Sequence, residues 1–89
     1  MAVYVDNYNA RFGNMIMSHM VADSIEELHQ MADEIGLPRK WFQRHHYDIC
    51  YSKKKLAVEN GAIALNLGRR DELVRFMAVW KRLRVAASK

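Results

Sequence analysis

The tetrapeptide Ser24-Ile25-Glu26-Glu27 constrains the fold more than any other feature of the sequence, because it marks where a helix begins. A serine N-cap followed three residues later by glutamate forms a capping box. Apolar residues then recur at spacings of three and four, and the sequence Gly36-Leu-Pro is typical of a helix end. We therefore predict a helix over residues 25–35 that buries Ile25, Leu28, Ala32 and Ile35.

In the segments around this helix, apolar and polar residues alternate as they do in β-strands. AVYVD (residues 2–6) and MIMSHMVAD (15–23) predict two strands, which the short, asparagine-rich loop 7–14 should join in antiparallel fashion. YDICY (47–51) predicts a third strand, and residues 62–65 a fourth.

The C-terminal half completes the predicted fold. A short helix capped by Ser52 and ending at Gly61 would connect the third and fourth strands, which predicts a parallel, right-handed unit. A last helix over residues 70–84 would place Leu73, Met77, Trp80 and Arg84 on one side, adjoined by Phe76 and Leu83. The prediction is a single α/β domain over residues 1–89, with a small mixed sheet of about four strands and about three helices.

Composition narrows the class of protein. Hydrophobic residues make up 51% and charged residues 27% of the chain, which is typical of a globular protein. No apolar run approaches the roughly 20 residues of a membrane span, and no secretory signal pattern is visible. Cys50 is the only cysteine, which excludes an intrachain disulfide and a CxxC zinc site. We expect a cytoplasmic protein with no membrane partner.

Charge is divided unevenly along the chain. Residues 1–35 contain one basic and six acidic residues, whereas residues 36–89 contain 13 basic and four acidic ones. This asymmetry favours an anionic partner or a self-complementary homodimer, although two solvated faces of opposite sign would give the same pattern. The apolar residues of the last helix could be buried in the domain's own core or across a homodimer, and we expect the homodimer.

Polar side chains gather at the ends of the predicted strands. Strand alternation places His19 on one face with Asp23, and His46 on one face with Asp48. Sites in α/β sheets are commonly found at such strand ends. The candidate constellation contains Asp6, His19, Asp23, His29, His46 and Asp48.

Three chemistries fit this constellation. Asp6, His19, His46 and Asp48 are ligand types for a divalent metal such as zinc or manganese. Histidine oriented by aspartate can also act as general acid or base, which makes His46, Asp48 and His19 the catalytic candidates. The third chemistry is phosphate binding at the helix that Ser52 begins, where Lys53 and Lys54 add positive charge.

Each of these side chains also has a structural interpretation. His19 could be a core histidine bonded to a backbone carbonyl, and His29 could pair with Asp33 or Glu26. Asp23 could interact with the dipole of the first helix. The three consecutive lysines could be a solvated face.

Bases and aromatics also interleave before the third strand, as they do on surfaces that stack bases and contact phosphates. The alternative is that Trp41 and Phe42 cover the core. The candidate ligand-binding residues are Lys53, Lys54, Arg44, Trp41 and Tyr47.

Several blocks of the sequence together resemble a known family. VYVD, HMVAD, EELHQMADEIGL, WFQ, HYDI, SKKKLAVENGA and ELVRF, in this order, are similar to domain of unknown function 4031, found in bacteriophages and bacteria. The resemblance implies a small phage or prophage protein in the bacterial cytoplasm and implies no particular activity. Members usually have an arginine in the block that reads SKKKLAV here. The recurring polar positions of the family correspond to Asp6, His19, Asp23, Glu27, His29, His46, Tyr47 and Asp48.

Two functional hypotheses follow. In the first, the His and Asp residues bind a phosphorylated ligand, either a nucleotide or a nucleic acid, with metal-assisted hydrolysis as a further step. In the second, a non-enzymatic protein modulates a host factor or nucleic acid through Trp41, Phe42 and the basic last helix. The residue patterns leave open whether the protein is an enzyme.

Overall fold

The computed structural model describes residues 2–88. One mixed sheet contains six strands in the order β4-β5-β3-β1-β6, with β2 paired to β3 beside this path. Three α-helices and one 3₁₀ turn complete the fold, which confirms the α/β class. The strands are β1 (Val3–Val5), β2 (Ala10–Phe12), β3 (Met15–Ala22), β4 (Phe42–Gln43), β5 (His46–Cys50) and β6 (Ile63–Ala64), and the helices are α1 (Ile25–Glu34), η1 (Arg39–Trp41), α2 (Tyr51–Glu59) and α3 (Arg70–Ala87).

The long strand β3 lies at the centre of the sheet and organises it. It pairs antiparallel with β1 on one side and with β5 on the other, and β6 pairs parallel with β1. The strands β5 and β6 therefore run in the same direction, as predicted, but β3 and β1 lie between them. Along the β3–β5 pair, His19 is directly opposite Asp48.

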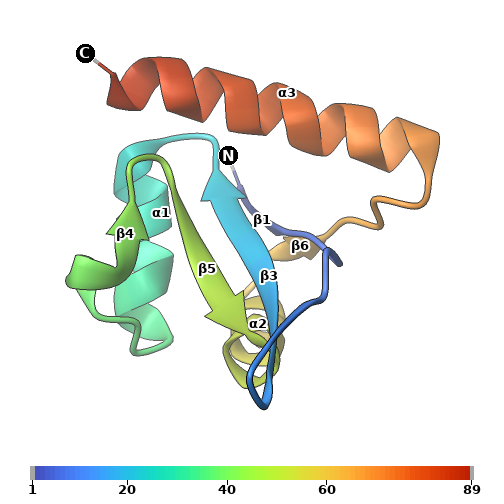
Figure 1. Cartoon of the computed structure of the whole chain (residues 1–89). Helices are drawn as coiled ribbons and strands as arrows, with labels where there is room; N and C mark the ends of the chain where they lie inside the picture. Colours follow the sequence, from blue (N-terminus) through green and yellow to red (C-terminus); the bar gives the residue numbers. More distant parts are fainter. Residues whose placement is uncertain (1, 89) are drawn as a thin grey trace.

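Helices α1 and α2 cover one face of the sheet, as Figure 1 shows. Ser24 caps the start of α1, where its hydroxyl accepts from the Glu27 amide at 3.2 Å. The Glu27 carboxylate accepts from the Ser24 hydroxyl at 2.9 Å, whereas in a full capping box it accepts from the Ser24 backbone N–H. The chain leaves α1 through Gly36 at φ 78°, a left-handed conformation that glycine adopts without strain. The predicted helix is confirmed, with Leu28 and Ala32 fully buried and Ile25 half-buried.

Helix α3 crosses one end of the opposite sheet face and leaves the rest of that face open (Figure 1). Its buried residues are Phe76, Val79 and Leu83, with Trp80 half-buried beside them. The predicted inward stripe was wrong in part, because Leu73, Met77 and Arg84 are exposed. The helix carries two adjacent apolar stripes, and the one that packs against the sheet contains Phe76, Val79 and Leu83.

Two strands were missed by the sequence prediction. The predicted loop 7–14 contains β2, which forms a hairpin with β3 through Gly13 at φ 62°. The strand β4 pairs with β5 across a tight turn in which Arg44 takes φ 64°, an uncommon conformation for arginine. Both strands are very short, so their alternation is too brief to stand out from the loops around them.

The start of the second helix was also predicted incorrectly. Helix α2 begins at Tyr51 with Cys50 at the N-cap, so Ser52 lies inside the first turn and does not cap it. The Ser52 hydroxyl instead lies 3.3 Å from the Cys50 sulfur. Within residues 2–88, none of the helices combines the length and the apolar character needed to cross a bilayer.

Candidate functional site

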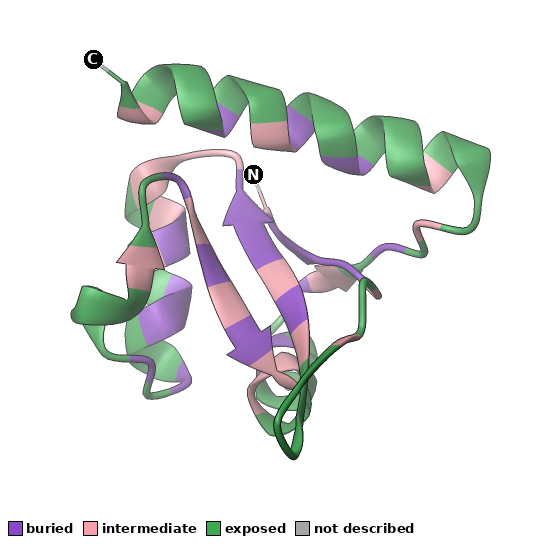
Figure 2. Ribbon diagram, viewed as in Figure 1, coloured by how far each residue is buried: buried purple, intermediate pink, exposed green. Residues whose placement is uncertain are grey.

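Three side chains converge on the open face of the sheet: His19 from β3, and His46 and Asp48 from β5. We call them the His–Asp cluster. The Asp48 Oδ1 atom lies 3.3 Å from His46 Nε2 and 3.7 Å from His19 Nε2. One ligand atom from each residue lies within 4.8 Å of the others. Figure 2 shows why they share a face, since buried and half-buried residues alternate along β5.

Asp6, just after β1, fixes the orientation of His19 from behind. Its Oδ2 accepts a hydrogen bond from His19 Nδ1 at 2.8 Å, while Oδ1 accepts from the backbone amides of His19 (2.8 Å) and Tyr8 (3.2 Å). Asp6 is only 1% exposed, and these three hydrogen bonds satisfy both of its buried carboxylate oxygens. With the proton held on Nδ1, the Nε2 lone pair of His19 is directed to the His–Asp cluster. The predicted proximity of Asp6 and His19 is thus found, with Asp6 as a residue that positions His19.

The electrostatics of the two histidines differ. The hydrogen bond to Asp6 raises the pKa of His19 above its usual value, against the opposing effect of burial. Burial lowers the pKa of His46, and Asp48 opposes this effect. Asp48 accepts from Gln43 through Oδ2 at 3.1 Å, but its Oδ1 is buried and has no hydrogen-bond donor among the described residues.

Trp80 from α3 packs against three histidines, a contact that the sequence did not predict. Its ring lies 4.6 Å from the rings of both His45 and His46, and 5.3 Å from that of His19. His45 is 8% exposed, and both of its ring nitrogens lack a partner among the described residues. Burial lowers the pKa of His45, followed by the nearby charges of Arg84 and Arg44. No sequence pattern linked α3 to the strands, so only the packing could identify this contact.

A groove of about 690 Å³ extends from the His–Asp cluster along the open sheet face. His19, Asp48 and Cys50 line it, the β2–β3 hairpin supplies one wall, and the segment around η1 supplies the other. In these walls, the Phe12 side chain is 72% exposed and the Trp41 side chain is 50% exposed. We call this space the groove.

The predicted ligand-binding residues are only partly brought together. Trp41 and Lys53 line the groove, and the Lys53 ammonium donates to the Ile35 carbonyl oxygen at 2.7 Å at the end of α1. Arg44 is exposed in the β4–β5 turn, and Lys54 is half-buried on α2. Tyr47 is fully buried on the opposite face of β5, so the structure places it away from the groove.

Two further members of the predicted constellation have structural contacts. Asp23 accepts from the Ala2 backbone amide at 2.8 Å and lies 3.4 Å from an Arg82 nitrogen, so it ties the start of the chain to α3. His29 Nδ1 shares a 2.8 Å hydrogen bond with the Tyr47 hydroxyl and does not pair with Asp33 or Glu26. Phe42 packs against the His29 ring, with ring centroids 4.7 Å apart.

The His29–Tyr47 pair gives a testable pH dependence. Burial is the main cause that lowers the pKa of His29, followed by the charge of Arg39, so the unfolded chain binds this proton more tightly than the folded chain does. The stabilising contribution of neutral His29 is therefore present above about pH 6.5 and is lost as the pH falls through the lower folded-state pKa. NMR titration should give His29 a pKa below 6.5, and His29→Gln should reduce the loss of thermal stability in acid. A measured His29 pKa above 6.5 would contradict this.

Comparison with known proteins adds a family. The model of the family described as protein of unknown function DUF4031 matches residues 3–79. This range contains β1 to β6 and most of α3, and it ends one residue before Trp80. No curated protein and no solved structure matches the chain.

Proposed function

This chain belongs to the family described as protein of unknown function DUF4031, and we propose for it a metal-dependent function. The His–Asp cluster binds a divalent transition metal ion, zinc or manganese, and the protein uses it to bind and hydrolyse a phosphate ester of a nucleotide or nucleic acid. The observation that carries the proposal is the Asp48 Oδ1 atom, which is buried without a donor beside two imidazole nitrogens.

The donor set and its spacing fit such an ion. Two imidazoles and a carboxylate form a common set for catalytic zinc, which keeps a further position open. Donor atoms around tetrahedral zinc are roughly 3.3 Å apart, since each bond is about 2.0–2.1 Å long. The separations of 3.3 Å and 3.7 Å to Asp48 Oδ1 are close to this value. An ion there would also give the buried Asp48 Oδ1 atom the positively charged partner that it lacks.

The hydrogen bond from His19 to Asp6 supports the same assignment. Metal-binding histidines usually donate their other ring N–H to a carboxylate or a carbonyl, which fixes the tautomer and orients the ring. His19 already has this arrangement through the 2.8 Å contact between Nδ1 and Asp6 Oδ2. The four candidate metal ligands from the sequence, Asp6, His19, His46 and Asp48, therefore divide into three proposed ligands and one positioning carboxylate.

The charges around the groove support a phosphate ester as the substrate. Arg11, Lys40 and Lys53 line it, and Asp48 is the one acidic residue among its lining residues. A bound ion would accept a phosphate oxygen as a ligand and neutralise charge that develops there. In the hydrolysis, a water oxygen forms the new bond to phosphorus, the ester P–O bond breaks, and the leaving oxygen takes up the proton that the water releases.

Substitution of His46 tests the metal site directly. His46→Ala should weaken zinc or manganese binding by more than about 100-fold, since loss of a mere positioning partner already costs 10- to 100-fold. It should lower the free energy of unfolding by only about 1 kcal/mol. Elemental mass spectrometry of protein purified without a histidine tag, before and after metal addition, measures the first effect.

His29→Ala is the matched control, because His29 lies on α1 and bonds Tyr47 on the other sheet face. It should retain stoichiometric metal. Equal metal content in the His46→Ala variant and the wild type, or no metal in the wild type under any condition, would overturn the proposed function.

The second hypothesis, an interaction protein, is favoured by one observation. The outward face of α3 exposes Leu73, Val74 and Met77, with Val74 60% exposed. A host factor or a second copy of the chain would bury these residues there, whereas Phe42 is half-buried and packed on His29. The phage-type origin, the cytoplasmic location and the homodimer stay predictions.

A further inference from the structure

The walls of the groove differ in character from the His–Asp cluster at its end. Three exposed aromatic side chains line the groove, namely Tyr8, Phe12 and Trp41. Phe12 belongs to β2, Tyr8 lies two residues before this strand, and Trp41 belongs to η1, so aromatic rings lie on both sides of the groove. An aromatic ring that is half or more exposed gains little from its own fold, since most of its apolar surface remains in water.

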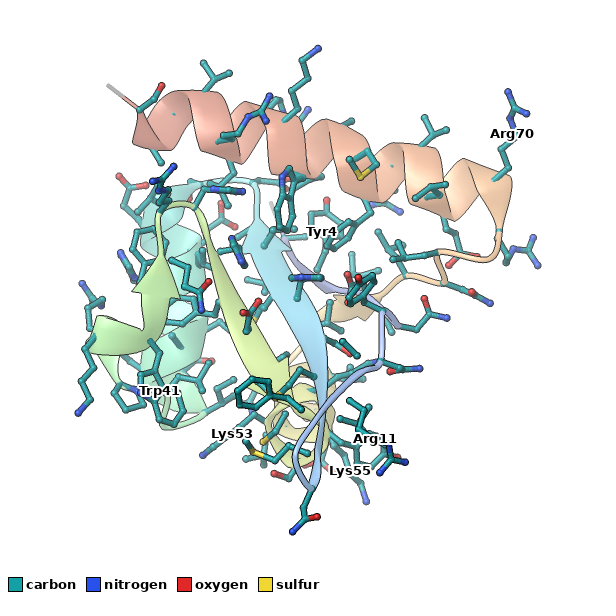
Figure 3. All side chains as sticks on the ribbon, viewed as in Figure 1. Tyr4, Arg11, Trp41, Lys53, Lys55 and Arg70 are labelled. Atoms are coloured by element: carbon teal, nitrogen blue, oxygen red, sulfur yellow. The ribbon has the colours of Figure 1, made fainter. Side chains whose placement is uncertain are left out.

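Cations accompany these rings. Arg11 precedes Phe12 and Lys40 precedes Trp41, so each wall presents a basic residue next to an aromatic one. Figure 3 shows Arg11 and Trp41 on opposite sides of the open face, with Lys53 between them. A positively charged groove lined by aromatic side chains is how proteins bind single-stranded nucleic acid, because every base has a face that can stack.

Positive charge also continues past the His–Asp cluster. Arg44 directly precedes His45 in the β4–β5 turn, and Arg84 lies one helical turn after Trp80, whose ring packs against His45 and His46. The cluster thus has basic side chains on the groove side and on the side away from it. A mononucleotide would occupy only one of these sides, whereas a strand with phosphates in both directions would contact both.

We propose that the groove binds a single strand of nucleic acid, with bases stacked on Phe12 and Trp41 and the backbone held by Arg11 and Lys40. This inference rests on the proposed function, since it places one backbone phosphate at the His–Asp cluster. The groove volume of about 690 Å³ lies within the range of ligand sites. Binding through the walls does not itself need the metal ion.

The experiment measures fluorescence anisotropy of a labelled short oligothymidylate and of an oligouridylate, in chelator and in added zinc. The double variant Phe12→Ala/Trp41→Ala should bind at least about tenfold more weakly, since each stacked base contributes substantially to affinity. The matched control is Tyr51→Ala, an aromatic residue that is 64% exposed and does not line the groove.

Salt dependence tests the cations separately. Arg11→Gln/Lys40→Gln should reduce the slope of log affinity against log salt concentration by about 1.4, at roughly 0.7 per single-strand phosphate contact. Arg70→Gln/Lys81→Gln on α3, of which Arg70 is labelled at the far end of that helix in Figure 3, should leave the slope unchanged.

The outcomes separate this inference from the metal site. Oligonucleotide binding that persists in His46→Ala and is lost in the Phe12/Trp41 double variant supports the inference, whatever the metal content. The inference would be overturned if the double variant retains oligonucleotide binding or if Tyr51→Ala loses it to the same extent. It would also be overturned if the wild type binds thymidine monophosphate but does not bind the oligonucleotide. If the protein binds stoichiometric metal while any of these results is obtained, the proposed metal site stands and only the single-strand inference fails.

Discussion

Replacement of Asp6 by asparagine is expected to weaken zinc binding at the His–Asp cluster strongly, although no proposed ligand is removed. The Asp6 Oδ1 atom accepts two backbone N–H groups, so the amide oxygen of asparagine has to take that position. The amide NH₂ group then lies where Oδ2 now faces His19 Nδ1 at 2.8 Å. The ring must accept there, which moves its own proton to Nε2 and removes the lone pair that would bind metal.

Zinc affinity should fall by at least about 100-fold, the upper end of the usual cost of a lost positioning partner. The free energy of unfolding should fall by about 1–2 kcal/mol, because one charge-assisted hydrogen bond becomes a neutral one. Competition calorimetry measures the affinity, and nitrogen chemical shifts of His19 report the tautomer. Asp33→Asn, at an exposed residue paired with Arg39, is the control. A His19 that keeps its proton on Nδ1 in the variant would contradict this explanation.

Trp80→Ala is expected to cause the largest loss of stability among substitutions near the site. The Trp80 ring contacts three histidines and lies 6.1 Å from the Phe76 ring, so it joins α3 to β3 and β5. Removal of a large aromatic side chain that is already partly exposed should cost about 3 kcal/mol, the low end of the range for buried aromatics. Urea denaturation measures the change.

Metal affinity should fall as well in this variant, because His46 would lose the ring that fixes its position. Trp80→Phe retains an apolar ring at the contact and should lose about 1 kcal/mol of stability. An unfolding free energy within about 0.5 kcal/mol of wild type in Trp80→Ala would show that α3 docks independently of this contact.

Much of the His–Asp cluster could be predicted from the sequence, because strand alternation is a local property. The two-residue period put His46 and Asp48 on one face before their neighbours were known, and the long alternating segment around His19 predicted a strand of the same sheet. The capping-box pattern similarly located α1, where the predicted contact between the Ser24 hydroxyl and the Glu27 amide forms.

The features of the site that the sequence did not predict depend on contacts between segments far apart in the chain. Tyr47 was assigned to the ligand site with its neighbours, but the same alternation turns it to the other face, where His29 accepts or donates its hydrogen bond. Trp80 belongs to one of two apolar stripes on α3, and only the docked sheet decides which stripe is buried. The β2 strand becomes recognisable only through its pairing with β3, which also forms one wall of the groove.

The central position of β3 has a consequence for the lifetime of the protein in a cell. Pairing between segments far apart in the chain forms late and slows folding, and the His–Asp cluster needs β1, β3 and β5 together, with Trp80 arriving from the last helix. In the unfolded chain only His46 and Asp48 lie close together, so the full set of three proposed ligands exists only in the folded chain. A metal that binds only the folded chain shifts the folding equilibrium by mass action, by about 2.7 kcal/mol at a hundredfold excess over its dissociation constant. Metal supply would then set how much of the chain escapes proteolysis.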